Sequence, residues 1–214
     1  MSSSPAPTPP GDGASQGAHL LKGRVLHTRI AAFLGLPFLL TSQPAWDAWI
    51  LYCLVWLGFL SIAFCVLGRA YASAFVGGRK NAALVAEGPF SVVRNPLYVF
   101  SFIGVVGVGL AAGSLVWAAI LALLFALYYP AVVAKEEAYL RGLFGADYDA
   151  YCARVPRWMP DLSLWRAPES VPLNPIFLFR TMRDGAWFFI APPVFAAIRL
   201  LQGAGLWPAW LAVY

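Results

Sequence analysis

Apolar residues in this chain come in long unbroken blocks rather than in an alternating pattern. The stretches Ala48 to Gly68 and Asn95 to Ala134 contain no Asp, Glu, Lys or Arg. Because a helix needs roughly 20 apolar residues to cross a bilayer, the first block predicts one transmembrane helix. The second block predicts two, joined by a tight turn near Gly113 and Ser114. Runs of this length exceed what a buried helix of a soluble domain requires, so the pattern predicts a polytopic membrane protein.

Shorter apolar stretches extend the pattern to an all-α membrane bundle of about five transmembrane helices. The predicted spans are Ile30 to Leu40, Trp49 to Leu67, Pro96 to Gly113, Leu115 to beyond Tyr129, and Trp187 to Leu201. We expect the fourth span to bend at Pro130 and to continue as the polar helix AKEEAYLRGLF. Arg180 and Arg183, set among aromatic residues, predict an interfacial helix before the fifth span. The terminal GLWPAWLAVY is too short to cross, so we expect it to re-enter the bilayer or lie in the interface.

The charge distribution predicts how these spans are oriented. The chain is 60% hydrophobic and 12% charged, with a net charge of +5. Every Lys and Arg except Arg199 falls before the first span, between the second and third, or between the fourth and fifth. This placement follows the positive-inside rule and argues against nucleic-acid binding. The N-terminus and the two long polar segments, Arg69 to Arg94 and Lys135 to Asp184, are therefore expected on the cytoplasmic side.

The remaining composition sets the domain boundaries. Residues 1–18 are rich in Pro, Ser and Gly, which predicts a disordered tail without the features of a signal peptide. Residues 19–163 are expected to form the membrane core, and residues 164–214 a C-terminal region with the interfacial helix, the fifth span and the apolar tail. Cys53, Cys65 and Cys152 have neither metal-ligand spacing nor a disulfide pattern, so no metal site is predicted.

The segment EGPFSVVRNPLY, residues 87–98, places polar residues at the entrance of the third span. Asn is a good N-cap and Pro is favoured as the first helical residue, so Asn95 and Pro96 predict the start of a helix. The free N–H groups and partial positive charge of a helix N-terminus also favour an anion, and Arg94 stands beside it. Tyr98, one turn further on, fits either an interfacial aromatic residue or a site residue.

A second polar segment, KEEAYLRGLFGADYDAYCARVPRWMP, follows the fourth span. Gly145 is expected to end that helix, and Asp147 to help start the next. An apolar face recurs at steps of four and three: Leu140, Phe144, Tyr148, Tyr151 and Val155. This spacing is typical of an amphipathic helix, which could simply lie on the membrane with its acids in solvent.

The adjacent acids Glu136 and Glu137 lie where this helix leaves the membrane. At least one of them should point toward protein or lipid headgroups, where it needs a partner such as Arg94 or Arg154. A helix N-terminus, an arginine and an acid that face one another could bind a zwitterion, with its carboxylate at the helix start and its ammonium at the glutamate.

These two segments resemble motifs of one family. GPFSVVRNPLY is similar to GPYxxxRHPxY, and EEAYLRGLFGADYDAYCARVP is similar to EExxLxxxFGxxYxxYxxRVP, at the expected separation. Both motifs belong to the isoprenylcysteine carboxyl methyltransferase and phospholipid methyltransferase group of integral membrane enzymes. The resemblance covers about Asn81 to Pro160. It implies an S-adenosylmethionine-dependent membrane methyltransferase, which we expect in a bacterial inner membrane. Because the site lies at the lipid boundary, we expect a lipidic or hydrophobic methyl acceptor that enters from the bilayer.

The resemblance also implies the position of the cofactor site, at the cytoplasmic face between the third and fourth spans. No GxGxxG motif of a Rossmann fold is present. Implied cofactor contacts are Ala82, Ala83, Leu84, Val85, Phe90, Arg94, Asn95, Pro96, Leu97, Tyr98 and Glu136, with Glu137, Tyr151 and Arg154 completing or bracing the pocket. Glu136 and Tyr98 are the expected proton acceptors for an amine or thiol substrate; a carboxylate substrate needs none.

The chain departs from the eukaryotic pattern at three places. Asn95 and Ala82 stand where the family carries histidines. The eukaryotic enzymes also carry an arginine about one turn before the acid pair, and that arginine is linked to the substrate carboxylate. Here the corresponding segment, YYPAVVA, has no arginine. The departures leave the acceptor open among carboxylate, amine and thiol. They also leave two other interpretations open: a non-catalytic relative or scaffold subunit, and an NADPH-dependent membrane reductase similar to the longer sterol reductases.

Overall fold

The computed structural model describes residues 37–77 and 83–214. The chain divides into two units, residues 1–41 and 42–214. In the described part of the first unit, residues 37–40 are helical, and Thr41 donates both its backbone N–H and its hydroxyl to the Pro37 carbonyl. Most of the predicted first span, Ile30 to Leu40, and the predicted tail, residues 1–18, lie outside the described residues.

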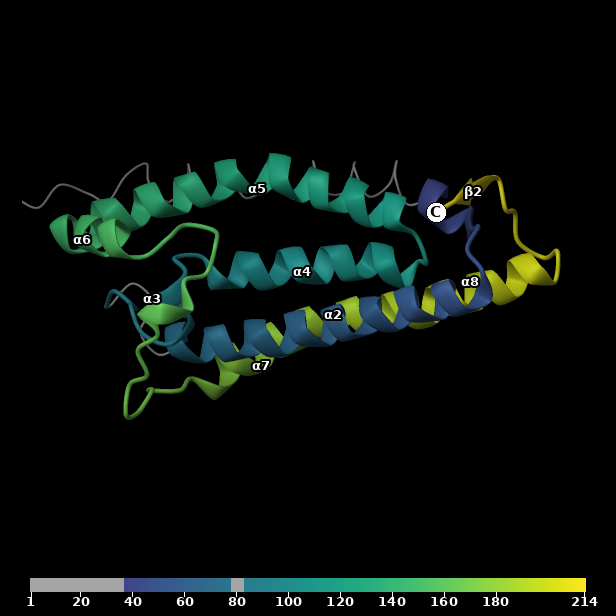
Figure 1. The fold of residues 1–214 in the computed structure, drawn as a ribbon. Helices are drawn as coiled ribbons and strands as arrows, with labels where there is room; N and C mark the ends of the chain where they lie inside the picture. The colour runs from purple at the N-terminus through teal and green to yellow at the C-terminus, as the bar shows by residue number, and fades with distance from the viewer. Residues whose placement is uncertain (1–36, 78–82) are drawn as a thin grey trace, which may run out of the picture. The chain divides into compact units, whose positions relative to one another are not determined.

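The second unit is mostly helical (Figure 1). Its long elements are α2 (Ala48–Val76), α4 (Pro96–Ala111) and α5 (Leu115–Phe144), and α4 lies between α2 and α5. Among the described residues, three helical segments are long and apolar enough to cross a membrane: Ala48–Val76, Leu115–Phe144 and Pro175–Gly203. The shorter apolar helix α4 accounts for the predicted third span. The prediction of a helical membrane protein is therefore confirmed.

Glycines let α2 and α4 approach one another closely. A β-carbon added at Gly58 of α2 would collide with the backbone of Ala111 and would lie 2.7 Å from the Gly107 carbonyl oxygen of α4. One added at Gly104 would lie 2.8 Å from the β-carbon of Cys65. Small residues at such positions are typical of helix pairs in membranes, because they let backbones pack in van der Waals contact. This packing fixes α4 along α2.

The sharp turn predicted at Gly145 is confirmed. Gly145 has a φ of 53°, a left-handed conformation that glycine adopts without the steric cost of a β-carbon. It ends α5 and precedes α6 (Ala146–Arg154), so that α6 folds back beside the end of α5. Arg141 of α5 donates to Asp149 of α6 across 2.6 Å, which ties the two helices together. The short helix α3 (Pro89–Val92) precedes α4, and the 3-10 turn η1 (Leu162–Leu164) follows α6.

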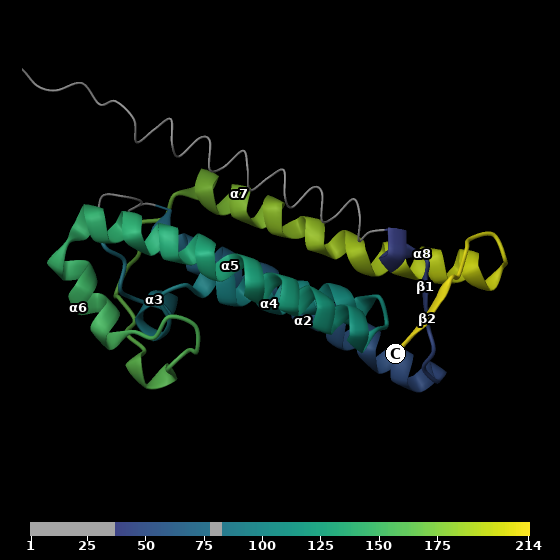
Figure 2. The ribbon, with the colours of Figure 1, turned by 90° about the horizontal axis from the view of Figure 1, so that it is seen from above.

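The C-terminal region differs from its prediction in two respects. Instead of a separate interfacial helix before the fifth span, α7 (Pro175–Ala186), η2 (Trp187–Ile190) and α8 (Ala191–Gly203) follow one another without a loop, as Figure 2 shows. The physical reason is that α7 packs against α2. It is therefore part of the helix bundle and not a separate surface helix.

The apolar tail is the second difference, since part of it forms a β-strand. Its strand β2 (Leu211–Val213) pairs in parallel with β1 (Ser42–Pro44), an exception to the all-α prediction. Ser114 Oγ and Val116 N both donate to the Tyr214 carbonyl, at 3.0 and 2.9 Å. The tail is therefore anchored where α4 turns into α5, at the opposite end of α5 from α6.

Candidate functional site

A cavity of about 440 Å³ lies where the polar ends of α4 and α5 meet α6. Its wall combines apolar and aromatic side chains with a few charged ones, as expected of a small-molecule site. The lining residues are Val76, Ala83, Leu84, Val85, Phe90, Arg94, Asn95, Pro96, Leu97, Tyr98, Glu136, Tyr139, Leu140, Phe144, Tyr148 and Tyr151.

Helix α4 begins at this cavity as the sequence predicts, with Pro96 as its first residue and the Asn95 carbonyl accepting from the N–H groups of Tyr98 and Val99. The Asn95 side chain, however, does not cap the helix. Its Nδ2 donates instead to Glu137 Oε1 at 3.1 Å and to the Arg157 carbonyl at 3.4 Å. A buried carboxylate is the stronger acceptor, because charge-assisted hydrogen bonds exceed neutral ones in strength.

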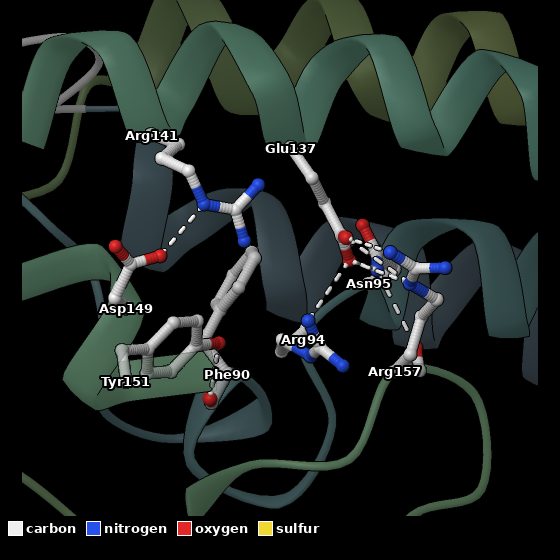
Figure 3. A network of polar contacts seen from close by, with 8 residues as sticks. All are labelled: Phe90, Arg94, Asn95, Glu137, Arg141, Asp149, Tyr151 and Arg157. Atoms are coloured by element: carbon white, nitrogen blue, oxygen red, sulfur yellow. Dashed lines mark hydrogen bonds and ion pairs between the residues drawn. The ribbon is translucent and has the colours of Figure 1, made fainter. Parts of the chain in front are cut away.

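Glu137 is the centre of a buried ionic network (Figure 3). The residue is 1% exposed, and its carboxylate accepts from Asn95 and Arg157 and lies 3.5 Å from Arg94 Nη1. Arg157 approaches both carboxylate oxygens through Nε, at 3.2 and 3.0 Å, and also through Nη2. The network joins α5 to the start of α4 and to the segment after α6. Glu137 therefore braces the site, and it does not line the cavity.

The network carries an excess of positive charge, because one carboxylate faces two guanidinium groups. Arg157 has the closer contact with Glu137, and Arg94 has the longer one. The Arg94 side chain is 15% exposed, lines the cavity, and has a buried Nε without a hydrogen-bond partner. Because two guanidinium groups share one carboxylate, the positive charge of Arg94 is only partly compensated, and together with the positive end of the α4 dipole it favours an anionic group in the cavity.

The opposite charge on the cavity wall comes from Glu136. Consecutive residues of an α-helix point about 100° apart, at 3.6 residues per turn, so Glu136 faces the cavity while Glu137 faces the network. Tyr98 Oη donates to Glu136 Oε2 at 2.8 Å, which holds the exposed carboxylate at the wall. Among the described residues that line the cavity, Glu136 is the only acidic one. The wall therefore has a positive part at Arg94 and a negative part at Glu136.

Helix α6 supplies the aromatic side of the cavity. Tyr148, Tyr151 and Val155 are buried together and pack against Leu84, Ala86, Leu140 and Phe144, which confirms the predicted apolar face. This face packs on protein and does not lie on the membrane. Tyr151 Oη donates to the Phe90 carbonyl at 2.8 Å. Burial raises the pKa of Tyr148 and of Tyr151, so both phenols remain neutral at physiological pH.

Most of the residues implied by the family resemblance meet in this one cavity. Eleven of them line it: Ala83, Leu84, Val85, Phe90, Arg94, Asn95, Pro96, Leu97, Tyr98, Glu136 and Tyr151. Glu137 lies behind the wall, and Arg154 lines two other cavities, of about 200 and 590 Å³. Ala82 lies outside the described residues. Arg157 is a site residue that the sequence did not indicate, since it stands in a loop without periodicity and its contact with Glu137 depends on the fold.

Metal ligands do not gather at this site. Within residues 37–77 and 83–214, no group of three or more His, Cys, Asp or Glu side chains is placed to hold a metal ion.

The composition of this site, at the polar end of apolar helices, agrees with the chain's similarity to known proteins. The profile of the phospholipid methyltransferase family matches residues 48–147. The chain is 35% identical to the nickel-cobalt-cadmium resistance protein NccN of Alcaligenes xylosoxydans xylosoxydans, over 90% of each chain. It is 34% identical to the cobalt-zinc-cadmium resistance protein CzcN of Cupriavidus metallidurans, over 87% of each. The chain therefore carries a phospholipid methyltransferase family domain at residues 48–147 and belongs to one family with these two bacterial metal resistance proteins.

A more distant relative confirms the resemblance to isoprenylcysteine methyltransferases. The protein-S-isoprenylcysteine O-methyltransferase of Schizosaccharomyces pombe is 31% identical over 101 residues, which are 47% of this chain and 43% of the yeast enzyme. No solved structure matches the chain.

Proposed function

We propose that this protein is an S-adenosylmethionine-dependent membrane methyltransferase and that the cavity between α4, α5 and α6 is its cofactor site. The observation that carries the proposal is the pair of opposite charges on one wall, Arg94 with the start of α4 and Glu136 with Tyr98. Membership of the phospholipid methyltransferase family supports it. The cavity volume of about 440 Å³ is in the range of small-molecule sites.

The donor set of the cavity fits a zwitterionic amino acid moiety. Arg94 on the cavity wall offers the positive charge of its guanidinium group to a carboxylate, and the positive end of the α4 helix dipole lies beside it. Glu136 offers a carboxylate to an ammonium group. Leu84, Val85 and Phe90 give an apolar wall for the nucleoside.

In the proposed reaction the protein positions the two reactants and excludes water. When bound, S-adenosylmethionine would supply a methyl group attached to a positively charged sulfur, and the electron pair of the broken carbon–sulfur bond would stay on that sulfur. A carboxylate acceptor requires no base. An amine or thiol acceptor must lose a proton, and Glu136, whose Oε2 is fixed by Tyr98, is the group on the wall that can accept it.

We further propose that the acceptor is a lipid or another hydrophobic molecule and that the site faces the cytoplasm. The cavity lies at the end of the apolar helices α4 and α5, where a bilayer molecule can reach it. The basic residues of the chain cluster on the same side of the predicted spans, which is the cytoplasmic side by the positive-inside rule. Both relatives come from bacteria, so the membrane that we propose is the bacterial inner membrane.

The direct test is binding of S-adenosylmethionine to the purified full-length protein in detergent, by calorimetry and by thermal shift. Glu136→Gln removes the wall charge and should abolish measurable binding. Glu169→Gln is the matched control, since it removes an exposed carboxylate that does not line the cavity, and it should bind normally. Equal binding by both variants would exclude the assignment of Glu136, and no binding by the unaltered protein would exclude the methyltransferase.

A non-catalytic role in metal resistance is the second candidate, and the two bacterial relatives named for such resistance favour it. A growth assay distinguishes the catalytic role from the non-catalytic one. A strain that lacks the protein is compared with strains that carry the unaltered chain or Glu136→Gln, on media with cobalt, nickel or cadmium. Tolerance restored by the variant as well as by the unaltered chain would indicate a scaffold, and tolerance restored only by the unaltered chain would indicate catalysis.

A further inference from the structure

A second cavity, of about 200 Å³, shares a wall with the first, because Tyr151 lines both. Apolar groups form most of its surface: Ala86, Val155, Leu164 and the ring of Tyr151. Arg154 and Arg166 give it a strongly basic edge, and none of the described residues that line it is acidic. The cavity therefore combines an apolar interior with two positive charges.

The two guanidinium groups are available to a ligand. Arg141, Arg157 and Arg183 each have a carboxylate partner within hydrogen-bond distance. The side chains of Arg154 and Arg166 have neither an ion pair nor a hydrogen bond within the described part of the chain, and both are exposed. Two uncompensated cations on the rim of one cavity attract an anion.

Backbone hydrogen bonds fix where Arg166 stands. Its N–H donates to Ser91 Oγ at 3.0 Å, and its carbonyl accepts from the N–H of Gly88 at 2.7 Å. The Ser91 hydroxyl in turn donates to the Gly88 carbonyl at 2.7 Å. Arg154 is the last residue of α6, which is attached to the same region through the bond from Tyr151 to the Phe90 carbonyl. The fold therefore holds both arginines at the cavity.

Neighbouring aromatic residues place this cavity at the membrane boundary. Trp165, which precedes Arg166, stacks on Tyr71 of α2 with ring centroids 6.5 Å apart and an angle of 12° between the planes. Tyr71 lies three residues beyond Gly68, where the charge-free block ends, and both rings are about half exposed. Trp and Tyr concentrate at the level of the lipid headgroups.

We infer that this second cavity binds the phosphate group of an anionic membrane lipid. Arg154 and Arg166 would take the phosphate oxygens, for which the planar guanidinium provides paired donors. The apolar wall would take the first carbons attached to the phosphate, which distinguishes a lipid from a free phosphate ion. Basic residues near a membrane surface attract the headgroups of anionic lipids. The inference does not depend on the proposed methyltransferase activity.

The test uses the full-length protein in a non-ionic detergent and short-chain dihexanoyl phosphatidic acid as the probe, titrated by calorimetry. Arg154→Gln and Arg166→Gln should each raise the dissociation constant by roughly tenfold or more, as expected for the loss of a charge-assisted hydrogen bond. Arg180→Gln is the matched control, because it removes an exposed arginine outside the cavity, and it should leave the dissociation constant unchanged. Thermal unfolding should be unaffected in all three variants, since none of these side chains has a partner to lose.

Two comparison ligands identify the source of the phosphate. Dihexanoyl phosphatidylcholine has the same chains but carries a cation beside its phosphate, and inorganic phosphate has no chains. Tighter binding of phosphatidic acid than of either would support the anionic lipid. Inorganic phosphate binding equally well would overturn it in favour of a free anion. An equal loss of binding in all three arginine variants, or no binding by the unaltered protein, would overturn the site.

Discussion

The side-chain amide of Asn95 donates a hydrogen bond to the carboxylate of Glu137, with Nδ2 3.1 Å from Oε1. This contact joins the residue before α4 to a buried acid near the end of α5. Asn95→Ala should lower the free energy of unfolding by about 1–3 kcal/mol, because the buried carboxylate loses a donor. Asn95→His keeps an N–H donor and should recover part of the loss. Thermal unfolding of the detergent-solubilised variants would measure the loss and the recovery. Identical unfolding midpoints for the Ala and His variants would show that the hydrogen bond contributes nothing.

The two adjacent glutamates should respond differently to the same substitution. Glu137→Gln leaves two arginines without a buried counter-charge and should cost about 3 kcal/mol, the lower end of the range for a broken buried pair. The lower end applies because the Arg157 side chain is 44% exposed and can turn toward solvent. Glu136→Gln, at an exposed position, should change stability by less than about 0.5 kcal/mol. Unfolding curves of the two variants check this, and a larger cost at Glu136 would reverse the roles given to the pair.

Close packing of α2 on α4 predicts a strong effect at Gly58. Gly58→Ala puts a β-carbon into the Ala111 backbone, forces the helices apart, and should destabilise by about 1–3 kcal/mol. Gly142→Ala in α5 is the matched control, because no atom lies within 4 Å of the added carbon. It should be neutral or stabilising by up to about 1 kcal/mol from helix propensity. Denaturation in mixed detergent micelles measures both, and equal effects would contradict the steric explanation.

Burial of Tyr151 predicts a dependence on alkaline pH. Because its folded-state pKa is raised above the usual value of about 10, the folded state favours the neutral phenol. This stabilisation is complete below pH 10 or so and is lost as the pH rises through the folded-state pKa. Tyr151→Phe should be less stable than the unaltered protein by about 1 kcal/mol at neutral pH, through loss of the bond to Phe90. The difference should narrow above pH 10, and melting temperatures of both proteins across this range would measure it. A constant difference would contradict the pKa shift.

Local patterns in the sequence predicted much of the fold. The charge-free blocks located α2, α4 and α5, Pro96 marked the start of α4, and Gly145 marked the turn into α6. The spacing of Leu140, Phe144, Tyr148 and Tyr151 indicated one apolar face. These features are local because helix periodicity, proline and glycine act within a few residues. The family motifs further indicated which residues would share a site, and eleven of them line one cavity.

The sequence by itself therefore determined a helical membrane protein with a phospholipid methyltransferase family domain and with its polar segments gathered at one end. Only the tertiary structure decided what the individual polar side chains do. It directed Asn95 to Glu137 instead of to its own helix, added Arg157 to the network, and separated Arg154 from the main cavity. The physical reason is that a buried charge selects its partners by distance in space, and the partners of Glu137 come from segments far apart in the chain, which no local period encodes.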